Sequence, residues 1–191
     1  MVFGDSHGVE PAYALSQQLE RRGESLKQMT YSACAPAFGR DGDVHCKAWT
    51  HAAINHILGQ PDLKHVVVTY RMTQHLAGKH LRTYPRLPDD VPEAVADRVW
   101  RSYIETLQVL TNHGKDVHIV LQPPELPGHV HDMVLYAAAT GNSGDISGVN
   151  MTWWSERNAY VMARLQDLPK RCACRRSRSR VLRQRRVQGR H

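Results

Sequence analysis

The chain has 191 residues, of which 41% are hydrophobic and 23% charged, a composition typical of a soluble globular protein with one domain. No apolar run approaches the roughly 18 residues that cross a bilayer, and no basic region followed by an apolar one opens the chain, so we expect neither a transmembrane segment nor a signal peptide. The net charge of +7 comes from residues 170–191, which hold ten Lys or Arg and no acidic residue. The other 169 residues hold fifteen basic and 18 acidic side chains. This charge balance gives no support for specific nucleic-acid binding.

Strand-like and helix-like segments alternate along the chain. In chain order the pattern predicts a strand at 1–4, a helix at 11–22, a weak strand at 26–31, a loop at 32–47, a helix at 48–58, a strand at 64–70, a proline-bearing stretch to about 92, a helix at 93–113, a strand at 117–121, a loop at 122–150 and a helix at 152–167. This alternation predicts an α/β fold with a parallel sheet covered by helices on both faces. Ligands of such folds bind at the C-terminal ends of the strands.

Residues 170–191 break the pattern, because arginine dominates them and no apolar periodicity is visible. We therefore divide the chain into a domain at 1–169 and a tail at 170–191 that cannot supply another buried strand, and we expect disorder or at best a marginal helix there. A second hypothesis for the tail is nonspecific binding of nucleic acid or another anionic surface through its basic side chains.

The four cysteines indicate no metal site, because no pair has C-x-x-C spacing. Cys34 and Cys46 either form a disulfide, which would indicate an oxidising compartment, or remain two partly buried free thiols. The His-rich segment 129–132 resembles a metal-ligand cluster, but a solvated loop is the better interpretation. We predict no metal and no cofactor.

The motif Gly4-Asp5-Ser6-His7 directly follows the first strand and precedes a helix. A serine on such a turn projects its hydroxyl above the sheet edge, and backbone N–H groups of the helix start can stabilise an oxyanion. Asp and Ser are also ordinary helix N-cap residues. The local sequence leaves both interpretations open.

The motif resembles block I of SGNH hydrolases, and in this form it resembles the SGNH domains attached to membrane acyltransferases that O-acetylate bacterial surface polysaccharides. Further segments are similar to that family in the same order: Ser32-Ala33-Cys34-Ala35-Pro36 after the second strand, Cys46 with Trp49, Val66 to Arg71 at the third strand, and Gly114 to Pro127 around the fourth. The resemblance covers about residues 1–169 and implies a three-layer, flavodoxin-like fold.

The resemblance implies acyl transfer through a seryl ester, with Ser6 as the nucleophile. The candidate catalytic residues are Ser6, Asp5 and His7, although His7 is more simply a residue of the pocket rim. Ser32, Ala33 and Arg71 are the candidates for oxyanion or substrate binding, and for Arg71 a plain salt bridge with an acid weighs equally. Cys34 and Cys46 match the cysteines of the family.

The sequence departs from the family at its C-terminal end. The family carries its catalytic pair in an Asp-x-x-His motif after a fifth strand, and no such motif follows residue 132. Asp62 and His65 have that spacing, but they precede the third strand and belong at the opposite sheet edge. His75, His80, His129 and His131 fall at the plausible edge without being singled out. We therefore expect the last strand and helix to be missing, and an inactive remnant of the fold is the alternative to an enzyme.

The resemblance also implies substrates, partners and a compartment. The substrate would be an acylated, most simply acetylated, cell-surface glycan or a small ester, and the partner would be a membrane acyltransferase domain. Related domains face the periplasm or the cell exterior of bacteria, and we expect the same of this chain.

Overall fold

The computed structural model describes residues 1–39, 44–77, 92–126, 129–141 and 149–175. Its strands are β1 (Val2–Gly4), β2 (Gln28–Thr30), β3 (His65–Thr69), β4 (Asp116–Val120) and β5 (Cys172–Arg175). Its helices are α1 (Val9–Glu20), α2 (Val44–Leu58), α3 (Met72–Ala77), α4 (Glu93–Asn112), α5 (Val130–Ala139), α6 (Met151–Arg157) and α7 (Ala159–Ala163), with 3-10 turns at Ser6–Gly8 and Leu165–Asp167.

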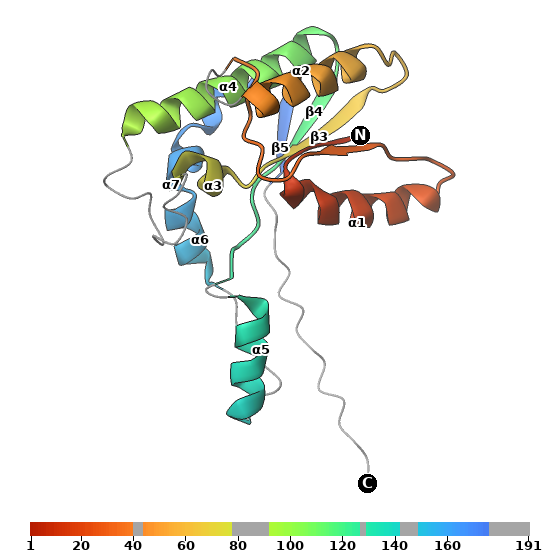
Figure 1. Ribbon diagram of the computed structural model, residues 1–191. Coiled ribbons are helices and arrows are strands. Elements are labelled where there is room, and N and C mark those ends of the chain that lie inside the picture. Colours follow the sequence, from red (N-terminus) through yellow and green to blue (C-terminus); the bar gives the residue numbers. More distant parts are fainter. Residues whose placement is uncertain (40–43, 78–91, 127–128, 142–148, 176–191) are drawn as a thin grey trace.

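The five strands form one parallel sheet in the order β2-β1-β3-β4-β5. Helices α2 and α4 lie on one side of this sheet and α1 lies on the other (Figure 1). The prediction of a parallel, flavodoxin-like α/β fold is therefore confirmed. Since all strands run the same way, their C-terminal ends share one edge, and the loops after β1, β3 and β4 meet there.

The main core lies between the sheet and the helices α2 and α4. Val66 and Val68 of β3 are fully buried on this face, together with Val117 and Ile119 of β4. Val99, Leu107 and Leu110 of α4 cover them and are also fully buried. The apolar face of this helix thus packs on the buried apolar side chains of the two strands.

The opposite face of the sheet is covered less completely. Val67 and His118 are only partly buried there, and with Leu15 and Leu19 of α1 they line an open hollow of about 820 Å³. Helix α1 therefore covers only the part of this face nearest β1. No helix follows β5 within the described residues.

Strand β5 corrects the expectation that the sheet lacks its last strand. It pairs in parallel with β4, with Cys172 opposite Val117. The short apolar run Cys172-Ala173-Cys174 stands inside the basic segment, and an edge strand needs only backbone hydrogen bonds to one neighbour. Residues 172–175, expected to be disordered or at best a marginal helix, thus form an edge strand, and residues 176–191 lie outside the described ranges.

Three helix predictions also change. The expected loop at 122–150 contains α5, and the proline-bearing stretch after β3 begins with the short helix α3. The expected helix at 152–167 is divided into α6, α7 and a 3-10 turn, because Asn158 interrupts it and donates its side-chain amide to the Trp154 carbonyl. Helix α5 has no buried residue and stands apart from the sheet (Figure 1).

Gly4 ends β1 with a backbone conformation that only glycine adopts easily. Its φ is +154°, and a Cβ at this position would overlap the carbonyl oxygen of Thr69 on β3. Because Gly4 has no side chain, the chain can pass close to β3 immediately before Asp5. This close approach sets the position of the turn that follows.

We predict that Gly4→Ala lowers the free energy of unfolding by about 3 kcal/mol, through backbone strain and the clash with Thr69. Gly23→Ala is the matched control, since Gly23 also has a positive φ but no atom within 4 Å of an added Cβ. The control should cost only about 1 kcal/mol. Urea unfolding of both variants measures the difference, and equal losses would contradict the assigned contact.

Candidate active site at the C-terminal edge of the sheet

The turn after β1 presents Ser6 to solvent and buries Asp5. Asp5 is the N-cap of the 3-10 turn Ser6–Gly8, and its Oδ1 accepts a hydrogen bond from the backbone N–H of His7 at 2.9 Å. Ser6 is exposed, whereas Asp5 is only 2% exposed. The capping role therefore belongs to Asp5, and the Ser6 hydroxyl lies at the surface of the strand–helix turn.

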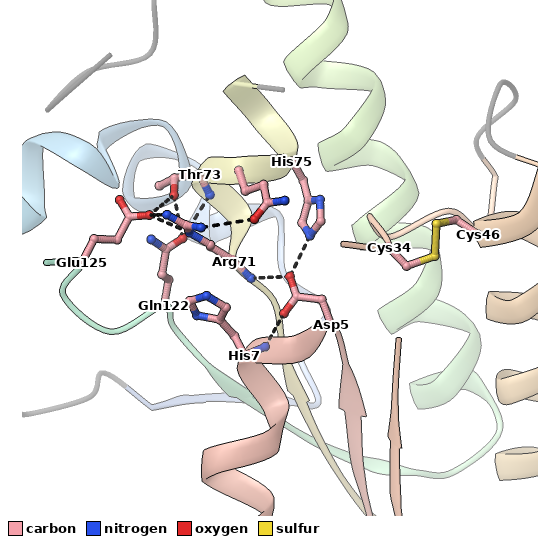
Figure 2. A network of polar contacts seen from close by, with 10 residues as sticks. Asp5, His7, Cys34, Cys46, Arg71, Thr73, His75, Gln122 and Glu125 are labelled. Carbon is pink, nitrogen blue, oxygen red and sulfur yellow. Dashed lines mark hydrogen bonds and ion pairs between the residues drawn. A yellow bond between two sulfur atoms is a disulfide. The ribbon is translucent and has the colours of Figure 1, made fainter. Parts of the chain in front are cut away.

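The Asp5 carboxylate joins this turn to the segment after β3. Its Oδ2 accepts hydrogen bonds from the backbone N–H of Arg71 at 2.8 Å and from Nε2 of His75 at 2.7 Å (Figure 2). Burial by itself raises the pKa of Asp5, but the donors on His75, Arg71 and His7 outweigh it and hold the pKa below its ordinary value. The carboxylate is therefore ionised at neutral pH and engaged by three donors.

His7 and His75 occupy different environments at this edge. The side chain of His75 is 4% exposed and lies against Asp5, while His7 is half-buried on the side of Arg71 and Gln122 (Figure 2). Burial lowers the pKa of His7, and the charge of Arg71 adds to this, although Asp5 and the carboxylates of Glu125 and Glu10 act in the opposite direction. His7 is thus a neutral imidazole at neutral pH.

Arg71 forms the salt bridge that was one of its two predicted roles. Its Nη2 lies 2.6 Å from Oε1 of Glu125, and its Nε donates to the same oxygen at 2.7 Å. The other oxygen of Glu125 accepts from Nε of Arg157 on α6 at 2.8 Å. Burial raises the pKa of Glu125, but the two guanidinium groups lower it by more. Nη1 of Arg71 also donates to Oε1 of Gln74 at 3.3 Å, and the side chain as a whole is still 30% exposed.

The loop after β4 is fixed to α3 and α6 by neutral hydrogen bonds. Gln122 is 2% exposed, and its Oε1 accepts from both the backbone N–H and the hydroxyl of Thr73. The indole N–H of Trp154 donates to the Gln122 carbonyl at 2.8 Å. Trp154 is 5% exposed and packs in the core, so this loop carries Glu125 on a rigid support.

The turn after β2 contains the two predicted oxyanion residues, Ser32 and Ala33, both exposed. Ala33 has φ +59°, a left-handed conformation that is uncommon for alanine. The next residue, Cys34, forms a disulfide with Cys46 of α2, which ties this turn to the helix layer. Tyr31 at its start donates its backbone N–H to the Gly4 carbonyl at 3.1 Å, so the turn lies beside the end of β1.

The remaining histidine candidates are not brought next to Ser6 by any contact in the described residues. His65 is the first residue of β3 and lies at the N-terminal edge of the sheet, opposite Ser6, as the sequence predicts for Asp62 and His65. His131 is 70% exposed on α5, His129 is its N-cap, and His80 lies outside the described residues. No group of three or more His, Cys, Asp or Glu side chains in the described part of the chain could hold a metal ion.

The bond between Asp5 and His75 and the pairing of Glu125 with two arginines are not predicted by the sequence. These partners are separated by 70 residues in one case and by 54 and 32 in the other. A usable signal existed for His75, which comes four residues after Arg71 in a segment that follows a buried strand. No local pattern indicates Arg157.

A comparison with protein families matches residues 1–182 to the SGNH domain that is fused to AT3 domains. No curated protein and no solved structure matches the chain. The family match indicates an activity of the esterase or acyltransferase type and an acyltransferase domain as the fused partner. None of the helices in the described ranges has the length and apolar character of a segment that crosses a bilayer.

We predict that Asp5→Asn destabilises the fold by about 2–3 kcal/mol at neutral pH, because the amide keeps only one acceptor oxygen and its NH2 group must face either the His7 N–H or the donors of Arg71 and His75. The lowered pKa of Asp5 stabilises the native state above the unfolded value near 3.8, and this contribution is lost as the pH falls through the lower native value. The difference between the wild type and the variant should therefore shrink below about pH 4. Urea unfolding between pH 3 and 7 measures it.

Asp132→Asn is the control for this experiment, since the Asp132 side chain is 78% exposed on α5. It should leave stability unchanged across the same range. A loss for Asp5→Asn that stays constant down to pH 3 would contradict an ionised Asp5.

Proposed function

Because the chain belongs to the family of SGNH domains fused to AT3 domains, we propose that it is a serine-dependent esterase or O-acyltransferase domain acting on acylated cell-surface glycans. The observation that carries the proposal is the exposed Ser6 on a strand–helix turn fixed by the buried Asp5. That arrangement supports a nucleophile at the edge where ligands of parallel sheets bind.

In the proposed reaction, the Ser6 Oγ attacks the carbonyl carbon of the ester and gives its proton to a general base. The base returns the proton to the leaving alkoxide as the ester C–O bond breaks, and an acyl-serine remains. Water or a sugar hydroxyl then takes the acyl group by the same steps in reverse. An acetyl group is the acyl group we propose.

His7 is the proposed base. It lies in the same turn as Ser6, and its lowered pKa keeps the imidazole in the neutral form that accepts a proton. Neighbouring side chains on a turn seldom face each other, so the transfer would pass through one water molecule. Asp5 is not the proposed base, because both of its oxygens already accept hydrogen bonds.

Three groups are proposed to stabilise the developing oxyanion. The first is the backbone N–H of Ser6, and the second comes from the turn at Ser32 and Ala33 beside the end of β1. The third is Arg71, whose side chain is anchored by Glu125 and is 30% exposed.

The disulfide between Cys34 and Cys46 supports an oxidising compartment, and we propose the periplasm or the cell exterior.

A second candidate is a non-catalytic member of the family. The observation that favours it is the sequence after residue 132, which contains no Asp-x-x-His motif. Removing the histidine from a serine protease triad costs on the order of a million-fold in rate, so a domain without a working base would be inactive. Binding by the basic tail stays a prediction, because residues 176–191 lie outside the described ranges.

Hydrolysis of p-nitrophenyl acetate tests the proposal. We predict that Ser6→Ala lowers kcat/KM by at least about a hundred-fold relative to the wild type. Ser16→Ala is the control, because Ser16 is a partly buried serine on α1 whose hydroxyl donates to the Tyr13 carbonyl. Equal rates for the wild type and Ser6→Ala would remove Ser6 from the mechanism, and a wild type without activity would favour the non-catalytic candidate.

The pH dependence of kcat/KM tests His7. A base must be deprotonated, so activity should fall on the acidic side with a midpoint below 6.5, because the pKa of His7 is lowered. In His7→Gln the acidic limb should disappear and the plateau should drop. An acidic limb that is unchanged in His7→Gln would assign the base to another group.

A further inference from the structure

We propose that His75 is a positioning residue for Ser6, acting through the Asp5 carboxylate. This inference rests on the proposed function, since it assigns a residue that orients the nucleophile of that reaction. Nothing in the motif Gly4-Asp5-Ser6-His7 points to His75, which enters the site from the segment after β3.

The contact between His75 and Asp5 is short and shielded from solvent. Nε2 of His75 lies 2.7 Å from Oδ2 of Asp5, and the two side chains are 4% and 2% exposed. The ring of Tyr70 packs edge-on against the imidazole, with 6.0 Å between the centroids and 76° between the planes. Tyr70 is itself 2% exposed, so the ring of His75 is fixed by packing as well as by the hydrogen bond.

The location of the proton follows from the acceptor. Asp5 is ionised, since its hydrogen bonds hold its pKa below the ordinary value, and a carboxylate offers only acceptor atoms. Nε2 of His75 therefore carries the hydrogen that forms the bond. A hydrogen bond to a charged, buried acceptor is among the stronger ones in proteins.

The two oxygens of Asp5 divide their donors between two segments. Oδ1 accepts from the His7 N–H inside the nucleophile turn, and Oδ2 accepts from the Arg71 N–H and from His75 after β3. Without His75, Oδ2 would keep one donor in a site from which water is excluded. The carboxylate would then turn toward other donors, and the bond to the His7 N–H would weaken.

That bond determines where Ser6 points, because Ser6 lies between Asp5 and His7 in the 3-10 turn. A displacement of about 1 Å in a reacting group can cost on the order of a hundred-fold in rate. His75 itself is too deeply buried to take a proton from an exposed serine, and its Nε2 is already engaged. Its contribution is therefore to geometry, which distinguishes it from the proposed base, His7.

The test compares His75→Leu, which removes the donor, with His75→Gln, whose amide can donate to Asp5 from a similar position. The control is His113→Leu, because the exposed ring of His113 also makes one hydrogen bond, to the Val109 carbonyl at the end of α4. For each variant the folded fraction is measured first, and kcat and KM for p-nitrophenyl acetate are then expressed per folded molecule.

We expect His75→Leu to lower kcat about ten- to a hundred-fold, with KM within about two-fold of the wild type and the acidic limb of the pH profile unmoved. His75→Gln should recover most of kcat, and His113→Leu should match the wild type. A purely structural role would reduce the folded fraction but leave kcat per folded molecule unchanged, and that result would overturn the proposal. If His75→Leu does not fold, the comparison rests on His75→Gln and a drop in kcat when Asp5→Asn is added to it.

Amide hydrogen exchange gives a second readout that does not need activity. The His7 amide should exchange at least about ten-fold faster in His75→Leu than in the wild type and His113→Leu, because its acceptor is no longer held. Unchanged protection of this amide would overturn the positioning role even if the protein proves inactive. Faster exchange in an inactive protein would support the positioning role while refuting the esterase, so the two proposals fail separately.

Discussion

The buried carboxylate of Asp5 is the interaction on which the arrangement of the site depends. It is the point where the turn after β1 and the segment after β3 are joined, through donors on His7, Arg71 and His75. A buried carboxylate is stable only when its oxygens are hydrogen-bonded, so the three donors and the ionised state of Asp5 depend on one another. Gly4 makes the position possible, because its lack of a side chain lets β1 end close against Thr69.

A second buried carboxylate, that of Glu125, organises the other side of the same edge. It pairs with Arg71 and Arg157 and so links the segments after β3 and β4 to α6. Arg71 takes part in both arrangements, with its backbone N–H on Asp5 and its side chain on Glu125. The charge of Glu125 is thereby balanced by two guanidinium groups, whereas Asp5 is held by two backbone N–H groups and the ring of His75. The salt bridge and the substrate-binding role, which the sequence left as alternatives, are compatible in this geometry.

Local patterns in the sequence were sufficient for the sheet up to β4 and for the placement of Ser6. The apolar run Val66-Val67-Val68 and the apolar face of α4 pack in the core, and the spacing of hydrophobic residues in the sequence detects such segments directly. The division of the last helix was missed because it involves a side-chain hydrogen bond of Asn158, which composition does not predict. Helix α5 was missed because it has no buried residue. Strand β5 was missed because its apolar run is only three residues long inside a basic segment, and the strand forms through backbone pairing with β4. The bond between Asp5 and His75 spans 70 residues, so only the fold brings it into view.

Covalent labelling of the whole chain with a fluorophosphonate, followed by peptide mapping, tests most directly whether this edge is a nucleophilic site. Such probes react with serines that are both activated and positioned, so the result reports on Ser6 without assuming a natural substrate. We predict one phosphonyl adduct per chain, located on the peptide that contains Ser6 and absent from Ser6→Ala. An unlabelled protein, or an adduct at a different residue, would contradict it.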